Sequence, residues 1–452
     1  MTWVSDSVGV LIMSLAFLGV IALAESWSRL GSPPPEWPRK LLHGGGGTVC
    51  LFFPFLISSA WLVLIMALVL SALFAIGRYT APLRCLESVE RHTHGAEYYP
   101  VAVFLLFLIA TGRPWLFVCS MLVLAVSDAS AALIGSSYGR VLYAVGEGSK
   151  SLEGSAAFLV VSFLVIHLPM LLMTDLSRAT CVLAALLVAL LVTGFEAIST
   201  RGTDNLFVPL GTCVILGRLT GKPEAELVFQ LISLLTLCLV IAFLAWRSRS
   251  FDTAGAIALM LFVYGAWSLG SVIWGAPILL GVLVYVVIWM HTPGPKWNAE
   301  GVKARLVAHA AAVPMMLVVC ANCTRAYAAL YGPYLSALTV MFTFVFWKHM
   351  RIHAGERMEA GRPSLPVCCV GAWLVTTPVP AALPCGANLA MLSPLAAALP
   401  TCLIANWYQQ RTPRPTQTGY WRASDFVTTV TAALATLLLQ YAHILPAWRA
   451  LS

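Results

Sequence analysis

Charged residues are scarce in this chain. Aspartate, glutamate, lysine and arginine make up 10% of the 452 residues, whereas hydrophobic residues make up 60%. Soluble domains usually carry about 25% charged residues, and apolar runs of membrane length occupy nearly all of this sequence. The scarcity excludes a soluble fold and indicates a polytopic membrane protein. The net charge of +8 comes mostly from short loops, so it reports membrane orientation and predicts no nucleic-acid partner.

Several other signals are missing. The first apolar run, residues 8–24, has neither a basic leader nor a clear cleavage site, so we interpret it as the first span. The sequence contains no convincing internal repeat. Most of the 12 cysteines lie in apolar runs. Cys320 and Cys323 form a CxxC, and Cys368 adjoins Cys369, but no second pair stands at zinc spacing, which favours packing over metal or redox chemistry.

The apolar runs predict an all-α polytopic protein with about 14–16 transmembrane helices, some of them short for a bilayer of about 30 Å. With the amino terminus outside, the loops rich in lysine and arginine fall on the inner side. We therefore predict an integral protein of the cell (inner) membrane whose motif loops face the cytoplasm. The candidate spans are residues 8–24, 44–57, 60–77, 98–112, 115–135, 155–174, 179–199, 205–218, 227–246, 254–270, 273–290, 306–320, 331–347, 366–382, 388–406 and 425–442.

Acidic residues divide the chain near residues 247–250. Of the 19 aspartates and glutamates, 14 precede this point and five follow it, and none of the five lies in the interior of a predicted span, since Asp425 is the first residue of its span. Chemistry that needs buried carboxylates therefore belongs to the first part. We predict a catalytic membrane domain over 1–250 and a second helical membrane domain over 251–452. The second domain has the character of a packing, lipid-shaping or oligomerisation domain, which leaves a homo-oligomer open.

The richest stretch is 127–158. A carboxylate inside a membrane costs roughly 3 kcal/mol or more, so Asp128, within the apolar run at 115–134, needs a cavity, a partner or a cation. A glycine-rich loop with a lysine follows, and such loops can present backbone N–H groups to phosphate. The alternative is an aspartate paired with an arginine, which would only fix helix packing. The loop residues that we assign to nucleotide binding are Gly146, Gly148, Lys150, Ser151, Glu153 and Gly154.

A second acidic group closes a later apolar run. Glu196 is embedded near the end of that run and needs a partner or a cation. Asp204 and Asn205 follow it and add two hard oxygen ligands on the same predicted membrane face. A simple Gly-Thr-Asp-Asn turn would account for residues 202–205 without function, but it would not account for Glu196.

Two further motifs have both a functional and a structural interpretation. Arg39, Lys40 and His43 precede four glycines and suit phosphate binding, but they also resemble a positive-inside anchor beside a closely packed helix. Glu97 and Tyr98 open a span after His92 and His94, and we assign them to substrate binding. Interfacial tyrosines are equally ordinary components of an aromatic belt, and the histidine spacing is not diagnostic of a metal.

Taken in order, these pieces resemble the membrane-embedded, CTP-dependent lipid-alcohol kinases, which include phytol kinase, dolichol kinase and yeast-type diacylglycerol kinase. The resemblance covers residues 30–245. The KSLEGS element also resembles the signature of CTP:phosphatidate cytidylyltransferases, which implies CTP as the donor. The matching pieces are RKLLH at 39–43, EYYP at 97–100, SDASAALIGSSYGR at 127–140, KSLEGS at 150–155, and Glu196, Asp204, Asn205 and Pro209.

The second part has only a weak likeness. Residues 248–270 look like the opening helix of the membrane family that contains plant phytyl-phosphate kinases. Because no acidic residue lies inside a predicted span of this part, we expect no second active kinase there.

The resemblance implies transfer of the γ-phosphoryl group of CTP to a long-chain isoprenoid alcohol (phytol, geranylgeraniol or a polyprenol) dissolved in the membrane lipids. It implies Asp128, Lys150 and Glu196 as catalytic residues, with Mg²⁺ held by Asp128, Glu153, Glu196, Asp204 and Asn205. Two alternatives stay open. One is a cytidylyltransferase acting on a phospholipid or a prenyl phosphate, and the other is a transporter or scaffold without nucleotide turnover.

Overall fold

A computed structural model gives the fold of residues 4–31, 36–80, 95–146, 148–291, 301–353, 364–377, 390–411 and 423–445. The all-α polytopic class is confirmed, because helices dominate these ranges and ten of them are long and apolar enough to cross a membrane. Helices satisfy their own backbone hydrogen bonds, which lipid cannot do. The protein is therefore an integral membrane protein. Three shorter apolar helices accompany the ten, at Ala60–Leu73, Tyr98–Ile109 and Leu365–Thr376.

The chain divides into two compact units, Met1–Ser233 and Leu234–Ser452. The division falls inside helix α12 (Glu224–Ser248), so this helix contributes residues to both units. The expected boundary near residue 250 lies just after the end of the same helix. Our assignment of separate roles to the two parts stays a prediction.

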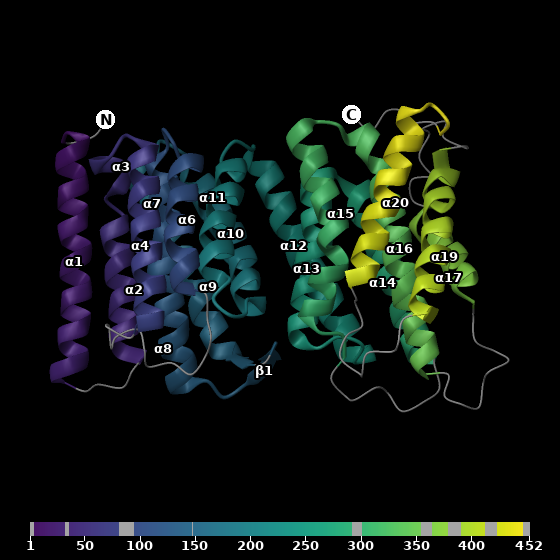
Figure 1. Cartoon of the computed structure of the whole chain (residues 1–452), viewed down its shortest axis with the longest axis horizontal. Coiled ribbons are helices and arrows are strands. Elements are labelled where there is room, and N and C mark those ends of the chain that lie inside the picture. The colour runs from purple at the N-terminus through teal and green to yellow at the C-terminus, as the bar shows by residue number, and fades with distance from the viewer. Residues whose placement is uncertain are drawn as a thin grey trace. The chain divides into compact units, whose positions relative to one another are not determined.

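The first unit consists of helices and one β-hairpin. In Figure 1 its helices run side by side, with β1 and α8 at the end of the unit opposite the amino terminus. Its elements are α1 (Asp6–Leu30), α2 (Glu36–Cys50), α3 (Phe53–Leu56), α4 (Ala60–Thr80), α6 (Gly95–Ile109), α7 (Pro114–Leu122), the π-helix η1 (Val123–Ser127), α8 (Asp128–Tyr138), β1 (Leu142–Val145), β2 (Gly148–Ser151), α9 (Leu152–Met173), α10 (Arg178–Ile198), α11 (Asp204–Leu219) and the start of α12.

Every predicted span overlaps a helix, but two regions differ in detail. The span expected at 44–57 is two helices, because α2 begins at Glu36 and ends at Cys50, and α3 begins separately at Phe53 with a proline in its first turn. Proline is tolerated there because the first N–H groups of a helix have no intrahelical partner. The expected glycine-rich loop after α8 is instead an antiparallel hairpin that pairs Tyr143 with Lys150.

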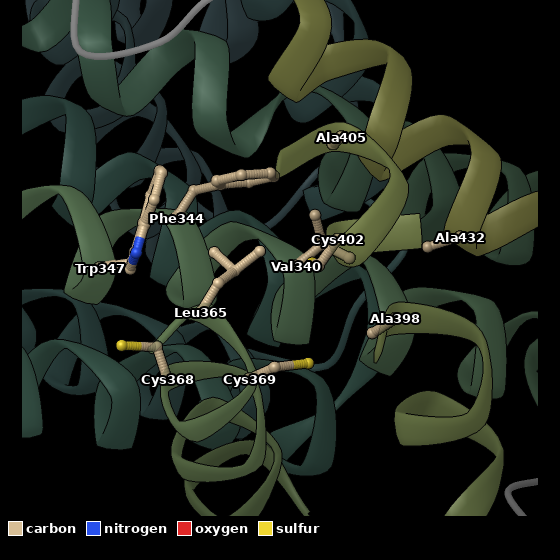
Figure 2. Packing of buried hydrophobic residues seen from close by; sticks show 10 residues of the cluster. All are labelled: Val340, Phe344, Trp347, Leu365, Cys368, Cys369, Ala398, Cys402, Ala405 and Ala432. Carbon is tan, nitrogen blue, oxygen red and sulfur yellow. The ribbon is translucent and has the colours of Figure 1, made fainter. Parts of the chain in front are cut away.

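The second unit surrounds α16, the most buried of the ten candidate spans. Figure 2 shows part of its core, a buried cluster to which α16 contributes two aromatic side chains, α17 and α19 contribute cysteines and α20 contributes an alanine. Its elements are the rest of α12, α13 (Thr253–Gly270), α14 (Val272–His291), α15 (Ala304–Thr324), α16 (Tyr327–His353), α17 (Leu365–Thr376), η3 (Ala390–Leu392), α19 (Ser393–Arg411) and α20 (Ala423–Tyr441).

Candidate active site

A lysine from the hairpin and a glutamate from α10 form a shielded ion pair. The Lys150 Nζ atom lies 2.6 Å from Glu196 Oε1 and also donates to the Glu196 backbone carbonyl. The two side chains are 23% and 9% exposed. Removing two charges from water is costly, and close pairing offsets that cost only where the geometry is good. The hairpin thus fixes a cation directly beside an intramembrane acid, although the two residues are 46 positions apart.

The second carboxylate oxygen of Glu196 is the unusual feature of this pair. Glu196 Oε2 is buried and has no hydrogen-bond partner. Buried polar atoms are nearly always hydrogen-bonded, so an exception calls for an explanation, such as an ion or a water molecule. This oxygen is therefore positioned as an acceptor for a cationic or hydrogen-bonding ligand.

Two more carboxylates act on this pair. Asp128 and Asp204 both interact electrostatically with Glu196, and Asp204 acts on Lys150 as well. Burial alone lowers the pKa of Lys150, but the negative charges of Glu196 and Asp204 outweigh it, and the pKa is raised. Lys150 is therefore a permanent cation at neutral pH, in a region where three acidic residues gather.

Asp128 is approached by a histidine from α2. The His43 Nε2 atom lies 3.2 Å from the Leu124 backbone carbonyl and 3.6 Å from Asp128 Oδ2. A carbonyl only accepts hydrogen bonds, so Nε2 carries a proton. The Tyr99 ring packs edge-on against this imidazole, with centroids 5.2 Å apart. His43 is thus held through its bond to the Leu124 carbonyl, with the Asp128 carboxylate close to the same nitrogen.

The carbonyl that receives His43 belongs to the π-helix η1, which immediately precedes Asp128. A π turn widens the helix and changes its hydrogen-bond register, and such turns occur often at functional sites. The widened turn packs closely on α2, because a Cβ added at Gly47 would lie 2.5 Å from the Ala125 Cβ. Glycine at position 47 therefore permits the close packing of α2 on η1, which brings His43 to the Leu124 carbonyl.

The glycines of the hairpin region have different roles from those expected of a flexible phosphate loop. Gly146 has φ +60 in the tight turn, a conformation that favours glycine. Gly154 lets α9 approach α8, since an added Cβ would lie 2.9 Å from the Ala131 carbonyl. The Gly154 N–H donates to the Ser151 side chain, which caps α9, while Gly148 pairs with Val145 in the hairpin. These contacts build a rigid support for Lys150.

The predicted supporting residues make bonds within the protein. The Glu153 carboxylate accepts from the Val141 N–H at 3.2 Å and 3.3 Å, which closes the base of the hairpin. The Asn205 side chain donates to the Gly95 carbonyl at 2.9 Å and joins α11 to α6. Asp204 begins α11, and its Oδ1 accepts from the Asn205 N–H at 3.1 Å. Glu153 and Asn205 thus shape the region through bonds that are already made.

The remaining predicted residues lie on α2 and α6. Lys40 is half-buried one helical turn before His43, and Tyr98 is half-buried at the start of α6. The side chains of Arg39 and Glu97 lie outside the described residues, as do His92 and His94 entirely.

Two tyrosines were missed by sequence reasoning. Tyr99, beside the predicted Tyr98, contacts His43, and the sequence did not predict this contact. Tyr143 lies opposite Lys150 in the hairpin, and its hydroxyl is 2.8 Å from Ser155 Oγ. Burial raises the pKa of Tyr143. The alternating sequence LYAV before two glycines is a hairpin signal that could have located this residue.

The protein oxygens gathered here fit a magnesium ion whose remaining coordination positions are filled by water and phosphate oxygens. Within the described residues no three His, Cys, Asp or Glu side chains are grouped closely enough to hold a metal by themselves. Mg²⁺ usually needs only one or two protein carboxylates, because waters and substrate phosphates complete its shell. The unpartnered Glu196 Oε2 and the nearby Asp128 and Asp204 match that requirement.

Comparison with known proteins gives one informative relative. No family model matches the chain, and no solved structure matches it. The phytol kinase of Synechocystis sp. (strain ATCC 27184 / PCC 6803 / Kazusa) is 36% identical over 207 residues, which are 45% of this chain and 88% of that protein. An alignment at this identity along nearly the whole relative shows common descent. The chain described here therefore belongs to the phytol kinase family.

Proposed function

We propose that the protein is a lipid kinase that transfers the γ-phosphoryl group of CTP to the hydroxyl of a long-chain isoprenoid alcohol. The observation that carries the proposal is the Lys150–Glu196 pair, with one unpartnered carboxylate oxygen, beside Asp128 and its histidine. Phosphoryl transfer relies mainly on positioning and charge neutralisation, which such a group supplies. The 36% identity to a phytol kinase supports this reaction class, and the KSLEGS resemblance supports CTP.

In this proposal Lys150 changes partner when the nucleotide binds. Its ammonium group turns from Glu196 toward a phosphate, for which lysine is a suitable point charge. The Glu196 carboxylate, released from Lys150, then holds magnesium together with Asp128 and Asp204. When bound, the metal neutralises charge that develops on the transferring phosphoryl group. The existing pair keeps both groups charged and in place before the nucleotide arrives.

The second part of the proposal concerns the alcohol. Asp128 accepts the proton of the hydroxyl, while the nearby His43 side chain helps to fix the orientation of the carboxylate. Arg39 and Lys40, one turn or less before His43 in the sequence, add positive charge for the nucleotide. Glu97 and Tyr98 contact the substrate. The alcohol enters from the lipid, and the site faces the cytoplasm, as the distribution of basic loops suggests.

The test is product analysis with purified protein, Mg²⁺, geranylgeraniol or phytol, and CTP labelled in either the α or the γ position. The kinase reaction moves γ-label into the lipid and releases CDP. A cytidylyltransferase would move α-label into the lipid and release pyrophosphate. Release of pyrophosphate, or full lipid phosphorylation by an Asp128→Asn variant, would contradict the proposal. Replacing CTP with ATP in parallel reactions checks the donor.

A further inference from the structure

The hairpin that carries Lys150 exposes apolar side chains on its outer side. Four large side chains at the base of the hairpin are 55–69% exposed, and we call them the hairpin patch: Tyr138, Val141, Leu142 and Leu152. The Leu152 N–H donates to the Val141 carbonyl at 2.9 Å, so these two residues lie side by side. Exposed apolar groups that gather in this way mark a contact surface for a membrane or for another protein.

The other side of the hairpin faces the candidate active site. Burial alternates along β1, where Leu142 is exposed and the next residue, Tyr143, is buried. Successive side chains of a strand point to opposite faces. Tyr143 pairs with Lys150 across the hairpin, and Lys150 bonds Glu196. A single strand therefore separates the hairpin patch from the ion pair.

The patch continues the exposed surface of α9. Every fourth residue at the start and middle of this helix is exposed, namely Leu152, Ala156, Val160, Leu164 and Leu168. Residues at this spacing form one row along a helix. Because α9 is a candidate membrane span with 28% of its apolar window buried, the row faces lipid. The row begins at Leu152, so the lipid-facing surface runs directly onto the hairpin.

The length of α9 sets the depth of the hairpin in the membrane. Its 22 residues rise about 33 Å, close to the roughly 30 Å of a bilayer's hydrocarbon. The preceding candidate span, Pro114–Tyr138, ends where the patch begins. Residues 139–151 therefore connect two spans at the level of the lipid headgroups. Tyr138, with its polar tip, and the exposed Arg140, which can bind lipid phosphate, both suit that layer.

We propose that the hairpin patch is inserted into the headgroup layer of the bilayer and holds Lys150 at the depth of the hydroxyl of a membrane-dissolved alcohol. The occupant is phospholipid, because the patch is continuous with a surface that lipid already covers. An alcohol in a bilayer keeps its hydroxyl in this layer, where it finds hydrogen-bond partners. The link to the alcohol rests on the proposed function, whereas the position of the patch does not.

Photolabelling of the full chain in phospholipid vesicles tests the position. One sample contains phosphatidylcholine with a diazirine next to its headgroup, and a parallel sample contains a water-soluble diazirine. Trypsin cuts after Arg140 and Lys150, so most of the hairpin is recovered as the peptide 141–150. We expect lipid adducts on Val141 and Leu142. Labelling by the soluble reagent alone would place the patch in water, and labelling by neither would mean that protein covers it; either result overturns the inference.

Two aspartate variants provide a matched pair. Leu142→Asp should lower the lipid labelling of 141–150 about tenfold, because lipid contact with the exposed part of a leucine has about that effect on an equilibrium. Leu30→Asp makes the same change at an exposed residue that ends α1, and labelling should not change. Equal labelling in both variants would refute the role of the patch. If Leu142→Asp does not fold, the adducts of the unmodified protein decide.

Kinetics of the same variants test the role as a positioning surface. With Leu142→Asp, the KM for geranylgeraniol in vesicles should rise while the KM for CTP stays constant. An unchanged KM for the alcohol, or a rise in the KM for CTP alone, would overturn this role.

The labelling requires no turnover, which separates the inference from the proposed function. A protein that phosphorylates no alcohol but carries lipid adducts on Val141 and Leu142 would contradict the kinase proposal and leave the position of the hairpin intact. An active kinase whose hairpin is labelled only from water would contradict the inference alone.

Discussion

Replacing Lys150 by methionine should both destabilise the first unit and abolish phosphoryl transfer. The change keeps the length of the side chain but leaves Glu196 buried without its cation. Breaking a buried pair in this way costs about 3–5 kcal/mol. Because the Lys150 side chain is 23% exposed, we expect the lower end of this range, about 3 kcal/mol. For a unit of 233 residues, that corresponds to a fall of roughly 6–12 °C in the unfolding midpoint.

A second substitution separates stability from chemistry. In the double variant Lys150→Met/Glu196→Gln the buried charge is removed, so most of the lost stability should return. Activity should not return, because the nucleotide still lacks its cation and the metal lacks a carboxylate. Removing one preorganised electrostatic contact typically lowers turnover by about 100- to 1,000-fold, and we expect at least that loss in both variants.

The assays are thermal unfolding in detergent, followed by intrinsic tryptophan fluorescence, and γ-label transfer to geranylgeraniol. Glu196→Gln alone is the control for loss of the carboxylate with the lysine retained. If the double variant recovers both stability and turnover, the ion pair contributes only to stability, and the proposed role of Lys150 in nucleotide binding is wrong. If Lys150→Met unfolds no earlier than the unmodified protein, the estimate of its burial energy is wrong.

Three further predictions address the surrounding contacts. His43→Ala should lower turnover with little change in the KM for CTP if the imidazole positions Asp128, whereas a rise in KM alone would assign His43 to the nucleotide. Gly154→Ala should lower the unfolding midpoint, because the new Cβ would lie 2.9 Å from a backbone carbonyl, while Gly44→Ala, with nothing within 4 Å, should not; equal midpoints would contradict the packing role. Since the pKa of Lys150 is raised above 10.5, the stability from its pairing should be constant from pH 7 to about pH 10 and decline above it, and a loss between pH 7 and 9 in unfolding scans would contradict this assignment.

Much of the membrane fold follows directly from the sequence. Apolar runs separated by basic loops indicate where each helix lies, because a backbone in lipid has few alternatives to the helix. Asp128 and Glu196, the clearest candidates for the site, could also be recognised from the sequence, because they are acidic residues in apolar surroundings. The structure joins Glu196 to Lys150, a pairing that no spacing rule gives for residues in different elements.

The remaining features depend on tertiary contacts. Nothing in the residues VLAVS indicates that they form a π turn, because the turn is selected by the packing of α2 against it. The glycines near Lys150 suggested a flexible loop, yet Gly154 serves helix packing and Gly146 serves a tight turn. In the second unit, Asp425 is the first residue of a predicted span, and the sequence did not indicate that it is buried and paired with Lys348 of α16.

The position of the division inside α12 has a practical consequence for dissecting this protein. A fragment ending at Ser233 would retain only residues 224–233 of that helix, about 15 Å of rise, which is half of a bilayer's hydrocarbon thickness. The truncated helix would end inside the bilayer, where the carbonyl groups of its last turn would have no hydrogen-bond donors. A fragment that carries the first unit should therefore extend through Ser248, and a fragment that carries the second should start upstream of Glu224, so that each has its own copy of the shared helix.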